Sequence, residues 1–204
     1  MTTLKSVVPG QSLAPLAASL SLLAALMPDE PEAHGLLALM LLHDARRQAR
    51  FGGDGELVLL GDQDRSLWDS GEIEAGRATL ERALALRGRG PYVLQAAIAS
   101  LHAEPHVDWP QVAALYAELA TLTGSPVVEL NRAVAVAECE GPQAALAIVE
   151  RLELGDYQYW HSTRAELLRR LGRGAEARAA YRRALELART APERRFLSRR
   201  LREL

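Results

Sequence analysis

Cysteine is almost absent from this sequence, with Cys139 the single occurrence among 204 residues. A single cysteine excludes an internal disulfide and fits a reducing compartment, so we expect a cytoplasmic location. Aromatic residues make up only 5% of the chain, while alanine and leucine dominate. This composition favours helices joined by close, small-residue contacts over a β-sandwich.

The sequence also lacks a hydrophobic run long enough to cross a membrane. Residues 13–27 form a mostly apolar run of fifteen, short of the roughly 20 residues that a spanning helix needs. One lysine precedes the run and no convincing small-residue cleavage site follows it, which disfavours a signal peptide. Four of its large apolar side chains share one helical face, which predicts a packed helix. These four are Leu16, Leu20, Leu23 and Met27.

Charge is unevenly distributed, although the net charge is only −2. Residues 1–150 carry 10 basic and 19 acidic side chains, a balance of −9, whereas residues 151–204 carry 14 arginines and 7 acids, a balance of +7. The asymmetry indicates either a polar partner surface or, as we favour, the two ends of a solenoid facing water. The acidic first part has no basic recognition helix, so we do not expect sequence-specific DNA binding by this chain alone.

Small and apolar residues recur with one spacing in two distant parts of the chain. The two sets are Gly71, Gly76, Leu80, Ala83 and Leu84, and Gly172, Ala177, Tyr181, Ala184 and Leu185. Their offset of 101 residues is close to three lengths of the tetratricopeptide unit, a helix–turn–helix of about 34 residues. In the second set the spacing is that of a helix packed along one side, and its alanines allow a neighbouring helix to come close. The sequence therefore predicts an all-α, tetratricopeptide-like superhelix of αα-hairpins.

Helix start and stop signals divide the chain into about ten helices, one of which should run from Gly141–Pro142 to Leu154. Capping residues followed by proline mark several starts, at Asp29–Pro31, Asp108–Pro110, Ser125–Pro126 and the capping box Thr190–Glu193. We expect residues 1–12 to be a disordered lead-in and residues 13–204 to form a single helical-repeat domain. Within that domain, the Arg-rich segment 191–204 should be a C-terminal capping helix, as a solenoid requires.

Residues 48–70 do not fit the repeat and predict an ordered insertion between the two helices of the first pair. Asp54–Gly55 is a hairpin-type turn, and residues 56–60 should form a short extended run. The insertion ends in the string DQDRSLWD, residues 62–69. Because a helical stack does not need such a segment, its polar residues are candidates for function.

No constellation of catalytic or metal-binding residues stands out. His102 and His106 have the spacing of a zinc pair, but Pro105 separates them and no third ligand is near in sequence. His34 and His43 lie on an apolar helix, where we expect hydrogen-bonded core or rim residues. We therefore predict a protein that is not an enzyme and needs neither a cofactor nor a metal ion.

Two groups of residues are too polar or aromatic to be explained by packing alone. The first combines charge with an aromatic ring, the mixture common at interface hot spots, and consists of Asp62, Gln63, Asp64, Arg65 and Trp68. The second is Asn131 and Arg132, which interrupt an apolar helix and would lie on the concave wall of the superhelix. Structural roles are equally open: the carboxylates as helix caps, Trp68 as an anchor of the insertion, and Asn131 as a partner of a neighbouring backbone.

Six strings in the chain resemble one known family. They are residues 36–47 (LLALMLLHDARR), 54–69 (DGELVLLGDQDRSLWD), 90–104 (GPYVLQAAIASLHAE) and 125–138 (SPVVELNRAVAVAE), together with AYRRALELA and ERRFLSRRL within 180–201. In this order they resemble the C-terminal, tetratricopeptide-like extension of a subgroup of bacterial extracytoplasmic-function RNA polymerase sigma factors. The resemblance covers roughly residues 20–204.

The resemblance implies a regulatory domain that modulates transcription initiation through contacts with sigma-factor domains or RNA polymerase. The polymerase-binding and promoter-reading regions of that family would precede the extension, and only about twenty residues do so here. The chain is therefore expected to be either the excised extension or a truncated relative. The alternative is a general tetratricopeptide adaptor or small-ligand sensor with no connection to polymerase. The oligomeric state does not follow from the sequence.

Overall fold

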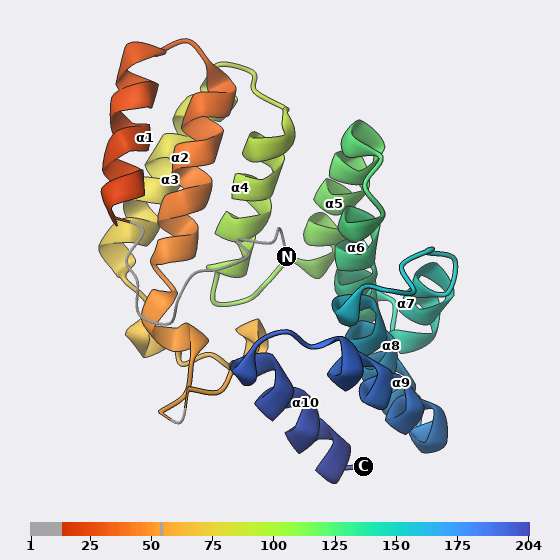
Figure 1. The fold of residues 1–204 in the computed structure, drawn as a ribbon. Coiled ribbons are helices and arrows are strands. Elements are labelled where there is room, and N and C mark those ends of the chain that lie inside the picture. Colours follow the sequence, from red (N-terminus) through yellow and green to blue (C-terminus); the bar gives the residue numbers. More distant parts are fainter. Residues whose placement is uncertain (1–13, 54) are drawn as a thin grey trace.

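A computed structural model describes residues 14–53 and 55–204, and within this part of the chain ten α-helices follow one another (Figure 1). They are α1 (Ala14–Leu26), α2 (Pro31–Asp44), α3 (Ser70–Ala85), α4 (Pro91–His102), α5 (Trp109–Thr123), α6 (Pro126–Cys139), α7 (Pro142–Val149), α8 (Gln158–Arg170), α9 (Gly174–Leu187) and α10 (Ala191–Arg202). Successive helices pack on one another along the chain. The predicted all-α arrangement of helical hairpins is confirmed. The lead-in expected at residues 1–12 lies outside the described residues.

The helices begin where the sequence places capping side chains. Asp108 accepts a hydrogen bond from the backbone of Gln111 at 2.9 Å, and Thr190 and Glu193 form the predicted capping box of α10. At α2, however, the cap is Glu30 and not the expected Asp29, because the carboxylate of Glu30 accepts from the backbone of the second helical residue. Each such bond satisfies a backbone N–H that the first helical turn leaves unpaired.

One glycine shows how closely the first hairpin is packed. A Cβ atom added to Gly76 would lie 2.8 Å from Cγ of Leu42, so α2 and α3 cross where α3 has no side chain. Gly76 is the repeat equivalent of Ala177, which is itself fully buried. The small residue at this position of the repeat therefore permits close helix contact, as predicted.

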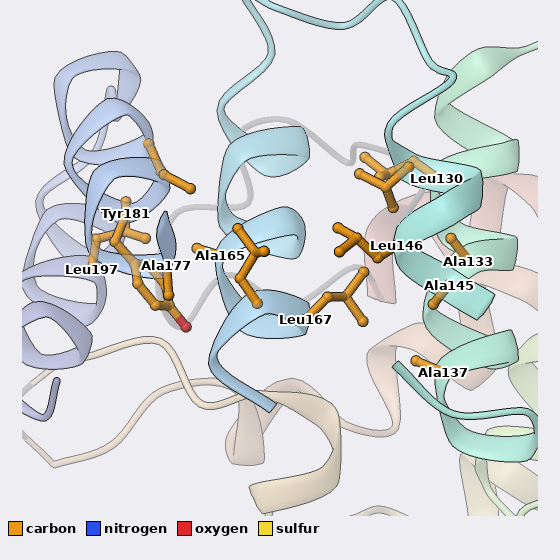
Figure 2. Close-up of a cluster of buried hydrophobic side chains, with 14 of the residues drawn as sticks. Leu130, Ala133, Ala137, Ala145, Leu146, Ala165, Leu167, Ala177, Tyr181 and Leu197 are labelled. Carbon is orange, nitrogen blue, oxygen red and sulfur yellow. The ribbon is translucent and has the colours of Figure 1, made fainter. Parts of the chain in front are cut away.

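The largest apolar cluster lies in the second half of the chain, between α6 and α10 (Figure 2). Tyr181, Ala177 and Ala184 of α9 are all 1% exposed or less. Leu197 of α10 joins the same cluster with no exposed surface. The last helix thus covers the end of the core with one buried leucine.

Two helices in the repeat depart from the sequence-based expectation. Leu84 is 50% exposed, although Leu185 at the equivalent repeat position packs against the core. Helix α7 ends at Val149, whereas we expected it to continue to Leu154. The chain turns there because Leu152 and Leu154 pack into the cluster from a non-helical segment, and their burial outweighs another turn of helix.

The outer face of α1 is also less covered than expected. Leu23 is 39% exposed and Met27 is 44% exposed, and the buried side chain near them is Ala24. The side chains of Leu16 and Leu20 lie outside the described residues. No helix in the described part of the chain is long and apolar enough to span a membrane.

Replacing Ala184 with leucine should lower the free energy of unfolding by about 1–3 kcal/mol, because the larger side chain overpacks a closed helix contact. Ala184 has no exposed surface. Urea denaturation measures the effect. Ala175→Leu on the same helix is the control, since Ala175 is exposed and its substitution should change stability by no more than about 0.5 kcal/mol. Equal stability of the two variants would contradict the repeat placement.

Candidate functional site

The insertion is a compact segment held together by backbone hydrogen bonds. It begins with a short 3-10 helix, Arg47–Arg50, which is followed by a turn. Its second half contains two further 3-10 helices, Leu60–Asp62 and Arg65–Leu67. The extended run expected at 56–60 amounts to one isolated antiparallel bridge between Phe51 and Leu57. Where the segment meets α3, the backbone N–H of Asp69 donates to Ala45 O at 2.8 Å. This bond fixes the end of the insertion against the end of α2.

Trp68 is the buried anchor of the insertion. Its side chain is only 8% exposed. The guanidinium of Arg65 lies 4.8 Å from the ring centroid, and that of Arg46, just beyond α2, lies 5.6 Å away. Such cation–π contacts are worth about 0.5–2 kcal/mol each, more when water is excluded. Trp68 therefore contributes to stability and offers little surface to a partner.

Arg65 ties the insertion to the end of α4. Its guanidinium donates to Glu104 O at 2.7 Å and to His102 O at 3.3 Å. The last carbonyls of a helix lack partners within it, and a basic side chain commonly satisfies them. Arg65 is nevertheless exposed, so it combines a structural role with a surface that a partner can reach.

A group of basic side chains surrounds Arg46, the residue whose guanidinium contacts the Trp68 ring. Nη2 of Arg46 lies 3.1 Å from Nδ1 of His43, and Arg50 donates to the backbone oxygen of His43. Burial, followed by the positive charge of Arg46, holds the pKa of His43 well below its ordinary value. Burial likewise lowers the pKa of Arg46 to about 10 and that of His102 to about 4. Both imidazoles are therefore neutral near pH 7.

The hydrogen-bonded role expected for the two histidines of α2 is confirmed. His43 bonds to the arginines at its own helix end. His34 lies with Nε2 3.1 Å from Pro28 O. His102 packs its ring against Trp109, with centroids 5.4 Å apart. In the described part of the chain, no group of three or more histidine, cysteine, aspartate or glutamate side chains is placed to hold a metal ion.

The three remaining polar residues of the insertion occupy different environments. Asp64 is exposed and caps the short helix that follows, accepting from the backbone and hydroxyl of Ser66 at 2.9 and 2.7 Å. The Ser66 hydroxyl bond is the main reason that the pKa of Asp64 is lowered. Gln63 turns inward and donates to Val58 O at 3.3 Å. Asp62 is exposed on the surface.

The second predicted patch lies on α6. Arg132 forms a two-bond ion pair with Glu129 on the preceding turn, at 2.9 and 2.6 Å. Asn131 is half-buried beside it. No hydrogen bond or ion pair in the described part of the chain connects either residue to the insertion. The structure thus brings together Asp62, Gln63, Asp64, Arg65 and Trp68, and leaves Asn131 and Arg132 as a separate group. The partner-binding roles of all seven residues stay predictions.

One contact of the insertion did not follow from the sequence pattern. Glu56 forms an ion pair with Arg199 of α10 at 2.8 Å, and Arg195 donates to Gly55 O at the same distance. These bonds join residues more than 130 positions apart and bring α10 against the insertion (Figure 1). A cavity of about 290 Å³ lies at this contact. The positive balance of residues 151–204 was the available signal, but it did not identify the partner.

Comparisons with known proteins give a family and a relative, both without an assigned function. Residues 6–84 match the model of a family of unknown function, DUF6596. This match spans α1 to α3 and includes the insertion. The chain is 49% identical over 182 residues to an uncharacterized protein of Rhizobium meliloti, a match that covers 86% of this chain and 43% of the relative. The chain thus spans less than half the length of that protein. No solved structure shows a significant match.

Proposed function

We propose that this chain is a non-enzymatic interaction domain that modulates bacterial transcription initiation in the cytoplasm through contacts with sigma-factor domains or RNA polymerase. The contact surface is the exposed side of the insertion, formed by Asp62, Asp64 and Arg65. Asn131 and Arg132 on α6 form a second contact patch for the same partner. Sequence-specific recognition of DNA is left to other domains.

The observation that carries this proposal is how rigidly the insertion is built. Trp68 is buried in contact with two guanidinium groups, and Arg65 is held by two backbone carbonyls at the end of α4. A loop fixed in this way presents its charges in one arrangement and loses little conformational entropy when it binds. The resemblance of the strings at 36–69 to sigma-factor extensions supports the choice of partner. The greater length of the Rhizobium relative fits a chain that works beside further domains.

Asp62→Ala combined with Asp64→Ala should weaken binding to the partner by at least about tenfold, because hydrogen bonds to charged groups contribute roughly 1.5–3 kcal/mol each. The tagged chain is immobilised, and purified core RNA polymerase and purified sigma-factor domains are passed over it separately. Asp62 makes no side-chain hydrogen bond in the described part of the chain, and Asp64 caps only a short helix. The melting temperature should therefore fall by no more than a few degrees.

Glu74→Ala is the matched control for the lost carboxylates, since Glu74 is exposed on the neighbouring helix α3. It should bind as tightly as the unaltered chain. If the double aspartate variant folds and also binds normally, the contact lies elsewhere. If the unaltered chain binds neither polymerase nor sigma domains, the proposed function is wrong and the adaptor interpretation takes its place.

A further inference from the structure

A cavity lies where helix α10 contacts the insertion, and one side of α10 lines it. The lining side chains of α10 are Arg194, Arg195, Ser198, Arg199 and Arg202, and Glu56 of the insertion completes the wall. Residues 194, 198 and 202 are four apart, as are 195 and 199, so each set shares a helical face. Regular helical spacing therefore brings four guanidinium groups to one opening.

Positive charge exceeds negative charge at the cavity, because four arginines and the single carboxylate of Glu56 line it, and Glu203, just beyond α10, adds one more carboxylate 3.6 Å from Arg199. Arg199 is paired with that carboxylate at 2.8 Å, and Arg195 is held by Gly55 O. Arg202 is exposed and forms no hydrogen bond or ion pair with any other described residue. Like-charged guanidinium groups at one opening repel one another, and an anion placed among them relieves that repulsion.

We propose that this cavity is a binding site for a small polyanion with phosphoryl groups, held by Arg195, Arg199 and Arg202. The planar guanidinium group donates two parallel hydrogen bonds to a phosphoryl oxygen pair, a geometry that lysine does not offer. The net positive charge of these arginines favours a polyanion, such as one with two linked phosphates. The volume of about 290 Å³ is at the lower end of the range for small-molecule sites, about 300–1,000 Å³.

The bound anion competes with Glu56 for Arg199. Glu56 accepts from Nη1 of Arg199, and its carboxylate also repels an anion in the same cavity. An anion that draws the Arg199 guanidinium toward itself therefore weakens the contact between α10 and the insertion. Replacing Glu56 with glutamine removes the competing charge and is expected to raise the affinity for the anion several-fold.

Isothermal titration calorimetry of the full 204-residue chain with sodium pyrophosphate tests the site, at constant ionic strength adjusted with sodium chloride. Arg195→Gln combined with Arg202→Gln should weaken binding by at least about tenfold, because two charge-assisted contacts are lost. Arg151→Gln combined with Arg182→Gln is the matched control. Both control arginines are exposed and lie outside the cavity, so this variant has the same net charge and should bind within about twofold of the unaltered chain.

Four outcomes would overturn the proposal. The first is no heat of binding with pyrophosphate, and the second is an equal loss of affinity in both double variants, which would show attraction to net charge alone. The third is equally tight binding of citrate, which would reject a preference for phosphoryl groups. Glu56→Gln gives an independent check with a gain of affinity, and Glu186→Gln, an exposed glutamate on α9, is its control. Loss of pyrophosphate binding in Glu56→Gln would equally contradict the site.

Discussion

Replacing Trp68 with alanine is expected to lower the free energy of unfolding by about 3–5 kcal/mol, the cost of removing a large buried aromatic side chain. The ring is 8% exposed, and the guanidinium groups of Arg46 and Arg65 both lie over it. Its removal leaves a void and takes away the aromatic face that both charges use. The insertion should therefore loosen before the rest of the chain unfolds.

Urea denaturation followed by circular dichroism measures the loss. Leu67→Ala is the control, because Leu67 is the preceding residue, is 46% exposed and should change stability by no more than about 0.5 kcal/mol. Trp68→Phe keeps an aromatic ring next to the arginines. It should retain more than half of the free energy of unfolding that Trp68→Ala loses. Equal stability of Trp68→Ala and the unaltered chain would show that the ring does not anchor the insertion.

The fold was predictable because its signals are local. A capping carboxylate and a proline lie within three residues of each other at the start of α5, and Asp108 forms the expected bond. A capping box is equally local, and Thr190 and Glu193 form it. The end of α7 was predicted incorrectly, because it depends on Leu152 and Leu154 packing against other helices. Burial of this kind has no signature within the segment itself.

The candidate site was predictable only in part, for the same reason. The position of the insertion follows from the break in helical periodicity after α2. The burial of Trp68, however, depends on Arg46 and on the side of the insertion that turns inward. Arg65 reaches carbonyl oxygens at the end of α4, some forty residues later in the chain. Sequence alone shows which residues can form such bonds and does not show which partners the fold brings within reach.

The Arg-lined cavity shows most clearly what cannot be predicted from the sequence alone. Arg195 and Arg199 occur in a segment with 14 arginines, and composition gives no reason to select these two. Glu56 of the insertion is 143 residues from Arg199. A charge balance summed over a segment indicates that a partner surface is possible. Only the tertiary contact between α10 and the insertion identifies which arginines share one cavity.

Lowering the pH from 7.5 to 5.5 is expected to reduce the free energy of unfolding by about 2–3 kcal/mol through His43 and His102. Burial lowers the pKa of His102 to about 4 and that of His43 well below its ordinary value. In the unfolded chain each histidine has a pKa near 6.5 and takes up a proton as the pH falls. Because the folded protein does not bind these protons, stability is complete above about pH 6.5 and declines below it, by up to about 1.4 kcal/mol per pH unit for each histidine.

Urea denaturation at pH 7.5, 6.5 and 5.5 measures this decline, and a double variant identifies its source. His43→Asn keeps a polar acceptor for Arg46, and His102→Phe keeps a ring against Trp109, yet neither new side chain binds a proton. The double variant should lose most of the pH dependence, whereas His106→Asn, at an exposed position, should retain it. An unfolding free energy that stays constant between pH 7.5 and 5.5 in the unaltered chain would mean that both imidazoles accept protons in the folded protein, and that the basic group around Arg46 is open to water.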